Sequence, residues 1–289
     1  MDNYGYDQLN ARILITGANG YIGRHLIAKY NEKKFLKISK KYNKDFIKCD
    51  LTSKNDILNL IQSYNITKII NLASFVPKNF KQYQSDKNNI NELIIYNIIE
   101  LFKCELVHIS SLAIYEGLNS PIIDEASKVV KLYSNYSLSK YNSEHIILNK
   151  YNYPYLIMRI PGIFGGDRKS GLIYNAIKKN LSGKKIKIKS LVNNWSAMYI
   201  DDLLEILYQK KIKSIKDKKI INVNYQKQLS MYEIINIISK NIIKEETYSK
   251  INKNLVNYKT NNFLNVFNYP KNTLEQSLIK YIKKLKNVK

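Results

Sequence analysis

The sequence has few residues of the kinds that mark disulfide frameworks, linkers and membrane segments. Its two cysteines, Cys49 and Cys104, provide no disulfide framework in a chain of 289 residues. Ten glycines and five prolines leave little room for linkers or low-complexity tails. No apolar run reaches the length of about 18 residues that a membrane span needs, and none has signal-peptide length at the N-terminus. We therefore expect a cytoplasmic globular protein without a membrane partner, with room for one large domain or a main domain and a smaller lobe.

Arginine and acidic residues are scarce relative to lysine. The chain carries 47 basic and 23 acidic residues for a formal net charge of +24, yet only four of the basic residues are arginines. Nucleic-acid-binding proteins favour arginine for bidentate and stacked contacts, and no zinc-finger, helix-turn-helix or RNA-recognition signature is present. We interpret the charge as a solvated lysine surface and expect no nucleic-acid partner. His25, His108 and His145 lack partners at metal-ligand spacing, so we expect no metal site.

Short apolar segments alternate with helical patterns through the first half of the chain. Strands are expected over 12–16, 35–39, 46–49, 68–72, 106–110 and 155–160, with helices ending near 30 and over 54–64, 88–102 and 135–150. Strands separated by helices in this rhythm form right-handed βαβ units. The predicted fold class is therefore α/β, a Rossmann-type doubly wound parallel sheet.

The rhythm changes after Gly165, where we expect a smaller C-terminal lobe. The expected elements are helices over 172–180, from 201, after 230 and from 273, and strands over 184–189, 196–200 and 220–224. We predict a dinucleotide-binding domain over 1–165 with return segments at about 196–225. Residues 166–195 and 226–289 would form the lobe that binds substrate.

A glycine-rich loop separates the first expected strand from the first expected helix. Gly17, Gly20 and Gly23 are spaced so that the first lets the chain turn, the second lets a pyrophosphate approach the backbone, and the third lets the helix pack on the sheet. The phosphate charge would then face the helix N-terminus. This context predicts a dinucleotide site rather than an ordinary strand–helix turn.

The end of the second expected strand bears on the choice of nicotinamide cofactor. An acidic side chain there suits the ribose 2′-hydroxyl, whereas basic or hydroxylic groups suit a 2′-phosphate. The sequence has Ser39, Lys40 and Lys41 at this point and no acid before Asp45. We therefore expect NADP(H), with NAD(H) as the alternative.

A serine, a tyrosine and a lysine form a candidate catalytic set. Tyr136 and Lys140 are four residues apart and share one helix face, so the ammonium would stabilise a phenolate whose ordinary pKa is about 10. The hydroxyl of Ser111 would hold the substrate oxygen while Tyr136 moves the proton.

With these residues the chain resembles the extended short-chain dehydrogenases/reductases that act on nucleotide sugars, the NAD-dependent epimerase/dehydratase family. The segments that match in family order are 16–23, 50–51, 71–74, Ser111 with Tyr136 and Lys140, 159–165, 199–203 and 272–278. The resemblance implies that Ser111, Tyr136 and Lys140 are catalytic. It also implies that Asp50 contacts the adenine, that Ala73 lies beside the cofactor with support from Asn89, and that Pro161 and Ile163 lie near the nicotinamide. The whole cofactor site that we predict comprises Gly17, Asn19, Gly20, Tyr21, Ile22, Gly23, Ser39, Lys40, Asp50, Leu51, Leu72, Ala73, Ser74, Asn89, Tyr136, Lys140, Pro161 and Ile163.

Departures from the family pattern argue against two of the reactions that members of the family catalyse. Family members that are 4,6-dehydratases have Asp-Glu directly after the catalytic hydroxyl residue, where this chain has Leu112 and Ala113. Members that epimerise next to a ketone have a cysteine at the place of Ala113. Two hypotheses about the function remain. We favour an NADPH-dependent reductase of a nucleotide-linked 4-keto-6-deoxy sugar in bacterial surface-glycan biosynthesis, and the alternative is an NAD-dependent 4-epimerase. A non-catalytic Rossmann binding protein is a third alternative, in which the catalytic set would be idle.

The expected helices over 88–102 and 135–150 carry broad apolar faces. In the family that the chain resembles, the equivalent helices pair across a two-fold axis as a four-helix bundle. The resemblance therefore implies a homodimer.

Overall fold

The computed structural model of the chain describes residues 10–30, 32–42, 44–76, 89–118, 120, 122–184, 196–209, 212, 215–243, 257–258 and 270–287. Contacts group the chain into two compact units. The first contains residues 1–118, 129–159 and 210–221, and the second contains residues 119–128, 160–209 and 222–289. This grouping puts residues 160–165 and 196–209 in the second unit, whereas the sequence pattern assigned them to the Rossmann part. The domain boundaries stay a prediction.

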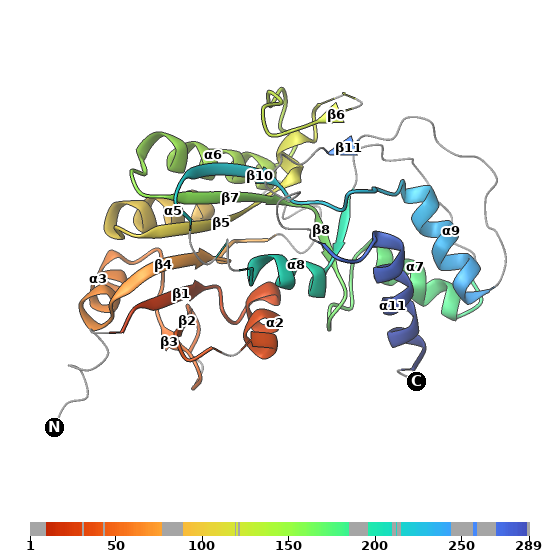
Figure 1. Ribbon diagram of the computed structural model, residues 1–289, viewed down its shortest axis with the longest axis horizontal. Helices are drawn as coiled ribbons and strands as arrows, with labels where there is room; N and C mark the ends of the chain where they lie inside the picture. Colours follow the sequence, from red (N-terminus) through yellow and green to blue (C-terminus); the bar gives the residue numbers. More distant parts are fainter. Residues whose placement is uncertain are drawn as a thin grey trace. The chain divides into compact units, whose positions relative to one another are not determined.

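The helices and strands follow one another as Figure 1 shows. The first unit carries all or most of β1 (Arg12–Thr16), α2 (Tyr21–Tyr30), β2 (Phe35–Ser39), β3 (Ile47–Lys48), α3 (Lys54–Ser63), β4 (Ile66–Asn71), α5 (Ile90–Leu101), β5 (Glu105–Ser111), the 3-10 helix η1 (Leu112–Tyr115), α6 (Asn135–Lys150), β7 (Tyr155–Ile160) and β10 (Lys218–Asn222). The second unit carries β6 (Ile122–Ile123), β8 (Gly162–Phe164), α7 (Leu172–Leu181), β9 (Ala197–Tyr199), α8 (Ile200–Leu207), α9 (Met231–Ile242), β11 (Asn257–Tyr258) and α11 (Leu274–Asn287).

Among the described residues, seven strands form the central sheet in the order β10-β7-β5-β4-β1-β2-β3. The pairings of β1 with β2 and β4, of β2 with β3, and of β4 with β5 are all parallel. The chain runs outward from β1 through β2 and β3, then returns to the other side of β1 at β4. Ligands of such sheets bind beyond the carboxyl ends of the strands at the point where the order reverses. The segments that follow β1 and β4 meet at this point.

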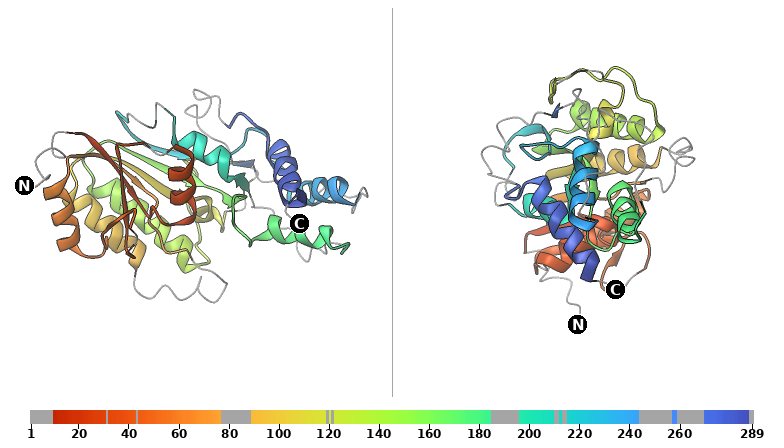
Figure 2. Two further views of the ribbon diagram at one scale, coloured as in Figure 1. Left: turned by 90° about the horizontal axis from the view of Figure 1, so that it is seen from below. Right: turned by 90° about the vertical axis from the view of Figure 1, so that its right-hand side faces the viewer.

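Helices cover both faces of this sheet in the first unit. α3, α5 and α6 lie on one face and α2 lies on the other, as the left view of Figure 2 shows. α6 packs against α5 as well as against β5 and η1. This arrangement confirms the α/β fold class with a doubly wound, Rossmann-type sheet.

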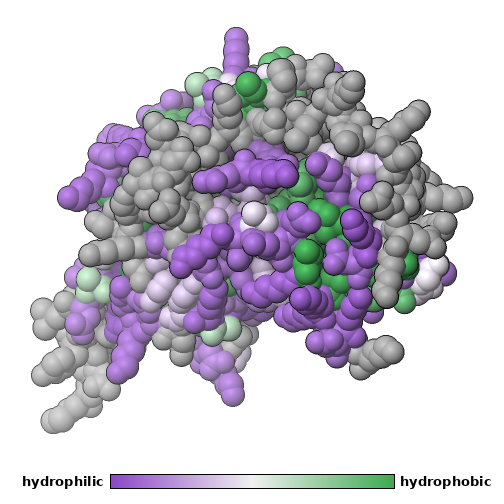
Figure 3. All heavy atoms as spheres, turned by 45° about the vertical axis from the view of Figure 1, so that its right-hand side comes forward, coloured by the Kyte–Doolittle hydropathy of each residue, from purple (hydrophilic) through white to green (hydrophobic). Residues whose placement is uncertain are grey.

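The surface is mostly hydrophilic on the face drawn in Figure 3, where purple side chains make up most of the described area. Within the described part of the chain, no helix is both long enough and apolar enough to span a membrane.

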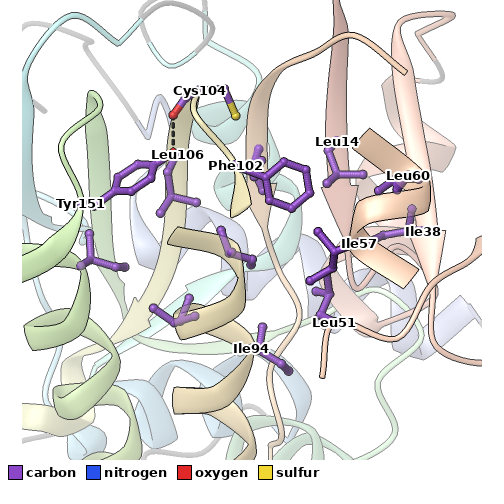
Figure 4. Close-up of a cluster of buried hydrophobic side chains, with 14 of the residues drawn as sticks. Leu14, Ile38, Leu51, Ile57, Leu60, Ile94, Phe102, Cys104, Leu106 and Tyr151 are labelled. Atoms are coloured by element: carbon purple, nitrogen blue, oxygen red, sulfur yellow. Dashed lines mark hydrogen bonds between the residues drawn. The ribbon is translucent and has the colours of Figure 1, made fainter. Parts of the chain in front are cut away.

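The main core of the first unit lies between the sheet and helices α3, α5 and α6. Figure 4 shows Leu14 and Ile38 of the sheet near Ile57 and Leu60 of α3. Burying each such side chain contributes about 1.5–3 kcal/mol. At one end of the cluster the hydroxyl of Tyr151 donates a hydrogen bond to the carbonyl oxygen of Cys104. These contacts hold α3 against the sheet and tie the C-terminal end of α6 to the segment before β5.

The second unit has its own core of helices and aromatic rings. α9 packs against both α7 and α11, and β8 pairs with β9 in parallel. The rings of Phe164, Tyr199 and Tyr281 contact one another at centroid distances of 5.4–6.0 Å. The carboxylate of Asp202, at the start of α8, is buried and accepts hydrogen bonds from Tyr225, Asn272 and Ser277 at 2.5–2.8 Å. The family-like segments 199–203 and 272–278 are therefore held together through Asp202.

The structure confirms most of the expected elements, with shifts at their ends. α6 and β7 have the expected bounds, while β3 is limited to two residues. The strand expected over 184–189 lies outside the described residues except for Lys184.

Candidate active site

The glycine loop has the close contacts that exclude larger residues. Gly17 has a φ of +60°, and a Cβ atom there would lie 2.7 Å from the backbone nitrogen of Ala73. A Cβ atom on Gly23 would lie 2.4 Å from the carbonyl oxygen of Gly17. At Gly20, by contrast, the nearest atom is the same carbonyl oxygen at 3.0 Å, and the residue is exposed. Gly17 and Gly23 thus set the turn and the helix packing, while Gly20 leaves the outer side of the loop open.

This loop fits the pyrophosphate of a dinucleotide. α2 begins directly after it at Tyr21 and has no acidic residue in its first turn. The N–H groups of a first helical turn carry partial positive charge and attract phosphate. Asn19 is exposed, and Tyr21 and Ile22 are half-buried, so all three are accessible to solvent, and their contact with a dinucleotide stays a prediction.

Thr16 connects the glycine loop to the end of β4. Its hydroxyl accepts hydrogen bonds of 3.1 Å from the backbone N–H groups of Leu72 and Ala73 and donates one of 2.6 Å to Asn71 Oδ1. The amide of Asn71 in turn lies 3.0 Å from Nδ1 of His108 on β5. Burial, reinforced by the charge of Lys140, lowers the pKa of His108 well below its ordinary value, so the ring is neutral. This buried chain fixes the strand ends at which the cofactor residues were predicted.

The two residues predicted at the adenosine end are paired with each other. Nζ of Lys40, just after β2, lies 2.8 Å from Asp50 Oδ2. Asp50 also accepts hydrogen bonds from the N–H and the hydroxyl of Thr52 at 3.0 and 2.8 Å. Partial burial raises the pKa of Asp50, but the bonds from Lys40 and Thr52 outweigh it and the net pKa is lowered. Ser39 is buried beside this pair, as is Leu51.

Asn91, which is not among the predicted site residues, links the end of β4 to the helix that carries Tyr136. Its Oδ1 accepts from the hydroxyl of Ser74 at 3.1 Å, and its Nδ2 donates to the hydroxyl of Ser139 at 3.1 Å. Asn89, which we expected to support the cofactor, precedes α5 in the left-handed conformation with a φ of +47° and makes no side-chain cap bond. The side chain that contacts Ser74 is therefore that of Asn91, two residues after Asn89.

Lys140 is buried and bound to the strand that ends in Ser111. Its Nζ donates a hydrogen bond of 2.9 Å to the carbonyl oxygen of Ile109, and the residue is only 3% exposed. Burial lowers the pKa of Lys140 to about 8, and the nearby carboxylate of Glu144 opposes that shift. Tyr136 lies one turn earlier on α6 and is half-buried. The ammonium is therefore held next to the end of β5 on the helix face that Tyr136 shares.

A buried ion pair lies one turn further along α6. Glu144 accepts hydrogen bonds from Arg159 at 2.6–3.1 Å and another from the hydroxyl of Ser110. Arg159 also donates to the hydroxyl of Tyr115, and its guanidinium lies 5.2 Å from the centre of that ring. Burial would lower the pKa of Arg159, but Glu144 outweighs it and the pKa is raised. The pair joins α6 to β5, η1 and β7 directly behind Ser111.

The two positions directly after Ser111 offer no side chain that transfers protons. The Ser111 hydroxyl oxygen accepts a hydrogen bond of 3.1 Å from the N–H of Ala113 and begins the 3-10 helix η1. Leu112 is buried in the same turn. The serine is thus fixed in place, and the two positions that follow it hold only apolar side chains.

The profile of the NAD dependent epimerase/dehydratase family matches residues 13–223. The chain belongs to this family. Membership makes it an enzyme of the nicotinamide-dependent kind and confirms the resemblance that the motifs indicated. It does not decide among reductase, epimerase and dehydratase chemistry, nor between NAD and NADP.

Individual relatives span several activities of the family. GDP-6-deoxy-D-talose 4-dehydrogenase of Aggregatibacter actinomycetemcomitans is 25% identical over 236 residues, which cover 78% of this chain and 79% of that protein. The structure resembles UDP-glucose 4-epimerase of Thermotoga maritima, with a TM-score of 0.73, 16% identity and coverage of 96% and 99% of the two chains. It also resembles dTDP-4-dehydrorhamnose reductase of Bacillus anthracis in complex with NADP, with a TM-score of 0.70, 18% identity and coverage of 94% and 99%.

Pro161 and Ile163 belong to the second unit and are buried there. Ile163 pairs with Met198 in the β8–β9 ladder, and its carbonyl oxygen accepts a hydrogen bond of 3.0 Å from Arg168 Nη1. The role of Pro161 and Ile163 beside a nicotinamide stays a prediction. Within the described residues, no group of His, Cys, Asp or Glu side chains is arranged to hold a metal ion.

Proposed function

We propose that the protein is an NADPH-dependent reductase of a nucleotide-linked 4-keto-6-deoxy sugar in surface-glycan biosynthesis. The observation that carries this proposal is the contrast on the two sides of Ser111. A buried lysine is bound at Ile109 before it, and two apolar side chains, Leu112 and Ala113, follow it. A site so built can deliver a proton to a carbonyl oxygen, and its two positions directly after Ser111 hold no acid–base pair for eliminating water.

The chain's own residues divide the chemistry among them. The cofactor, when bound in reduced form, supplies a hydride to the keto carbon. The hydroxyl of Ser111 donates a hydrogen bond to the keto oxygen, and the phenol of Tyr136 gives its proton to that oxygen as the charge develops. Lys140 remains protonated below its pKa of about 8, so its charge stabilises the phenolate that Tyr136 becomes.

Two similarities support a reaction at the sugar C4 position. The relative from A. actinomycetemcomitans is a 4-dehydrogenase of a GDP-linked 6-deoxy sugar, and the B. anthracis structure is a 4-dehydrorhamnose reductase with NADP. Lys40 after β2 supports NADP, because a lysine there suits the 2′-phosphate.

A panel of nucleotide-linked 4-keto sugars tests the proposal. We expect the purified enzyme to oxidise NADPH in a sugar-dependent way with at least one UDP-, GDP- or dTDP-linked substrate. Absence of NADPH and NADH oxidation across the panel would refute the reductase assignment.

One observation favours the 4-epimerase as the second candidate. Lys40 is engaged by Asp50 at 2.8 Å, which lessens its availability for a 2′-phosphate and suits NAD. An epimerase of this kind retains its NAD, so protein that is purified with bound NAD and turns over without added cofactor would support this candidate instead.

We also propose that the protein forms a homodimer through α5 and α6. Leu93 and Tyr96 of α5 and Leu138 and Leu148 of α6 are large apolar side chains that are each 37–43% exposed, and the two helices pack side by side. A dimer would bury these side chains. Light scattering of wild type and of Leu93→Glu is expected to give a dimer and a monomer respectively; a wild-type monomer at micromolar concentration would refute the proposal.

A further inference from the structure

A single carboxylate connects the segment of Ser111 to the helix that carries Tyr136. Glu116 follows η1, five residues after Ser111. Its Oε1 accepts hydrogen bonds from the backbone N–H of Tyr133, from the backbone N–H of Ser134 at 2.9 Å, and from the hydroxyl of Ser137. All three donors lie just before α6 or in its first turn.

The backbones of these two segments also make an unusually close approach. A Cβ atom added to Gly117 would lie 2.2 Å from the carbonyl oxygen of Lys131, so only glycine allows the contact. Residues 119–128, between the two segments, belong to the second unit. Glu116 and Gly117 therefore close the loop at the point where the chain leaves the first unit and re-enters it.

The start of α6 is closed by a capping box whose two serines, Ser134 and Ser137, both donate hydrogen bonds to Glu116. Ser134 is the N-cap, and its hydroxyl accepts a hydrogen bond of 3.1 Å from the N–H of Ser137. Ser137 is fully buried, and its hydroxyl lies 2.9 Å from that of Ser134. Tyr136 lies between these two serines, so a carboxylate that binds both also fixes the backbone that carries the phenol.

Two attachments thus hold Tyr136 relative to Ser111, one on each side of it along α6. Lys140 binds Ile109, two residues before Ser111, and Glu116 binds the helix start from five residues after Ser111. The negative charge of Glu116 also suits the positive end of the helix. Removing the carboxylate of Glu116 removes three hydrogen bonds between the serine segment and the start of α6.

We propose that Glu116 is a positioning residue that sets the separation of the Ser111 hydroxyl and the Tyr136 phenol; its effect on turnover rests on the function proposed above. The hydrogen bonds that its carboxylate accepts come from Tyr133, Ser134 and Ser137, which are neither the proposed reacting groups nor part of the glycine loop. Its loss should therefore lower kcat while the affinity for NADPH stays the same.

Steady-state kinetics of Glu116→Ala, Glu116→Gln and Glu233→Ala provide the first test. Glu233 is a matched control, because it accepts hydrogen bonds from the N–H and the hydroxyl of Ser230 at the start of α9 in the second unit. A misplacement of about 1 Å costs roughly 100-fold in rate, so we expect Glu116→Ala to lose about 10- to 100-fold in kcat, with NADPH affinity unchanged. Glu116→Gln keeps an acceptor oxygen and should recover most of the loss. A loss no larger than that of Glu233→Ala at a similar fall in Tm would overturn the proposal.

A double-mutant cycle with Ser111→Ala separates positioning from general damage. Without the serine hydroxyl there is nothing for Glu116 to align, so Glu116→Ala should cost less than about twofold further in that background. If the fold losses in kcat of the two single variants simply multiply in the double variant, Glu116 acts independently of Ser111, which contradicts the proposal.

Hydrogen exchange tests the attachment without any substrate. Glu116→Ala should speed the exchange of the Tyr133 and Ser134 amides at least tenfold, whereas Glu233→Ala should leave them unchanged. Unchanged exchange in Glu116→Ala refutes the proposal whatever the substrate is. If no sugar turns over with wild type, the proposed function fails, and the exchange result still decides whether Glu116 holds the two segments together.

Discussion

The ammonium of Lys140 donates a 2.9 Å hydrogen bond to the carbonyl oxygen of Ile109, two residues before Ser111. The bond joins the helix of the tyrosine to the strand of the serine. It also holds the ammonium of Lys140 in the protein interior, where burial lowers the pKa of Lys140 to about 8. Activity and stability should therefore both respond to the titration of Lys140.

We predict that kcat falls as pH rises through about 8, because the ammonium that stabilises the Tyr136 phenolate is then lost. Stability should change in the opposite direction. The folded pKa lies below the ordinary 10.5, so the unfolded chain binds more protons between these values and the folded state gains stability as pH rises. The difference in Tm between wild type and Lys140→Met, measured across this range, should shift in favour of wild type. A pH-independent kcat together with a constant Tm difference would contradict this prediction.

Removing the charge of Glu144 should affect both stability and the pH profile. Glu144 and Arg159 are 1% and 6% exposed, and leaving one partner of a buried pair alone costs about 3–5 kcal/mol. Glu144→Gln should lose free energy of unfolding on this scale, and Glu144→Gln/Arg159→Met should recover part of it in urea unfolding. Because Glu144 raises the pKa of Lys140, the alkaline fall of kcat in Glu144→Gln should move to lower pH. An unmoved pH profile in a folded variant would show that Glu144 does not influence Lys140.

Lys40 should distinguish the two nicotinamide cofactors. Lys40→Glu places a negative charge where the 2′-phosphate is expected, and a lost charged hydrogen bond of about 1.5–3 kcal/mol corresponds to roughly a 10- to 100-fold weaker binding of NADPH. Binding of NADH should change little. The control is Lys103→Glu. Lys103 is an exposed lysine just before β5, at the amino ends of the parallel strands, whereas Lys40 lies at their carboxyl ends. Fluorescence titration that finds equal losses for both cofactors would remove Lys40 from this role.

The sequence allowed good predictions where the signal is local. The alternation of apolar segments fixed the order of strands and helices, and the spacing of Gly17, Gly20 and Gly23 identified a loop whose close contacts the structure confirms. Tyr136 and Lys140 were identified by their helical spacing and their distance from Ser111.

Contacts between residues far apart in sequence could not be predicted in this way. Asn91 and Ser139, which are hydrogen-bonded, are 48 residues apart in sequence, and Glu116 and Ser134 are 18 residues apart. These contacts are visible only once α5, α6 and η1 are packed together. Lys40 and Asp50 were both predicted at the cofactor, yet their mutual ion pair depends on the adjacency of β2 and β3. Glu144 was not predicted; its position on α6 four residues after Lys140 is the sequence signal that could have identified it.

The most direct test follows the hydrogen atom itself, using NADPH deuterated at the transferable position and a 4-keto sugar nucleotide. Wild type should yield a sugar with deuterium at C4 and one NADP⁺ for each product molecule. Tyr136→Phe should fold, bind NADPH as wild type does and form almost no product. Product formed without net NADPH consumption, or an active Tyr136→Phe, would contradict the account.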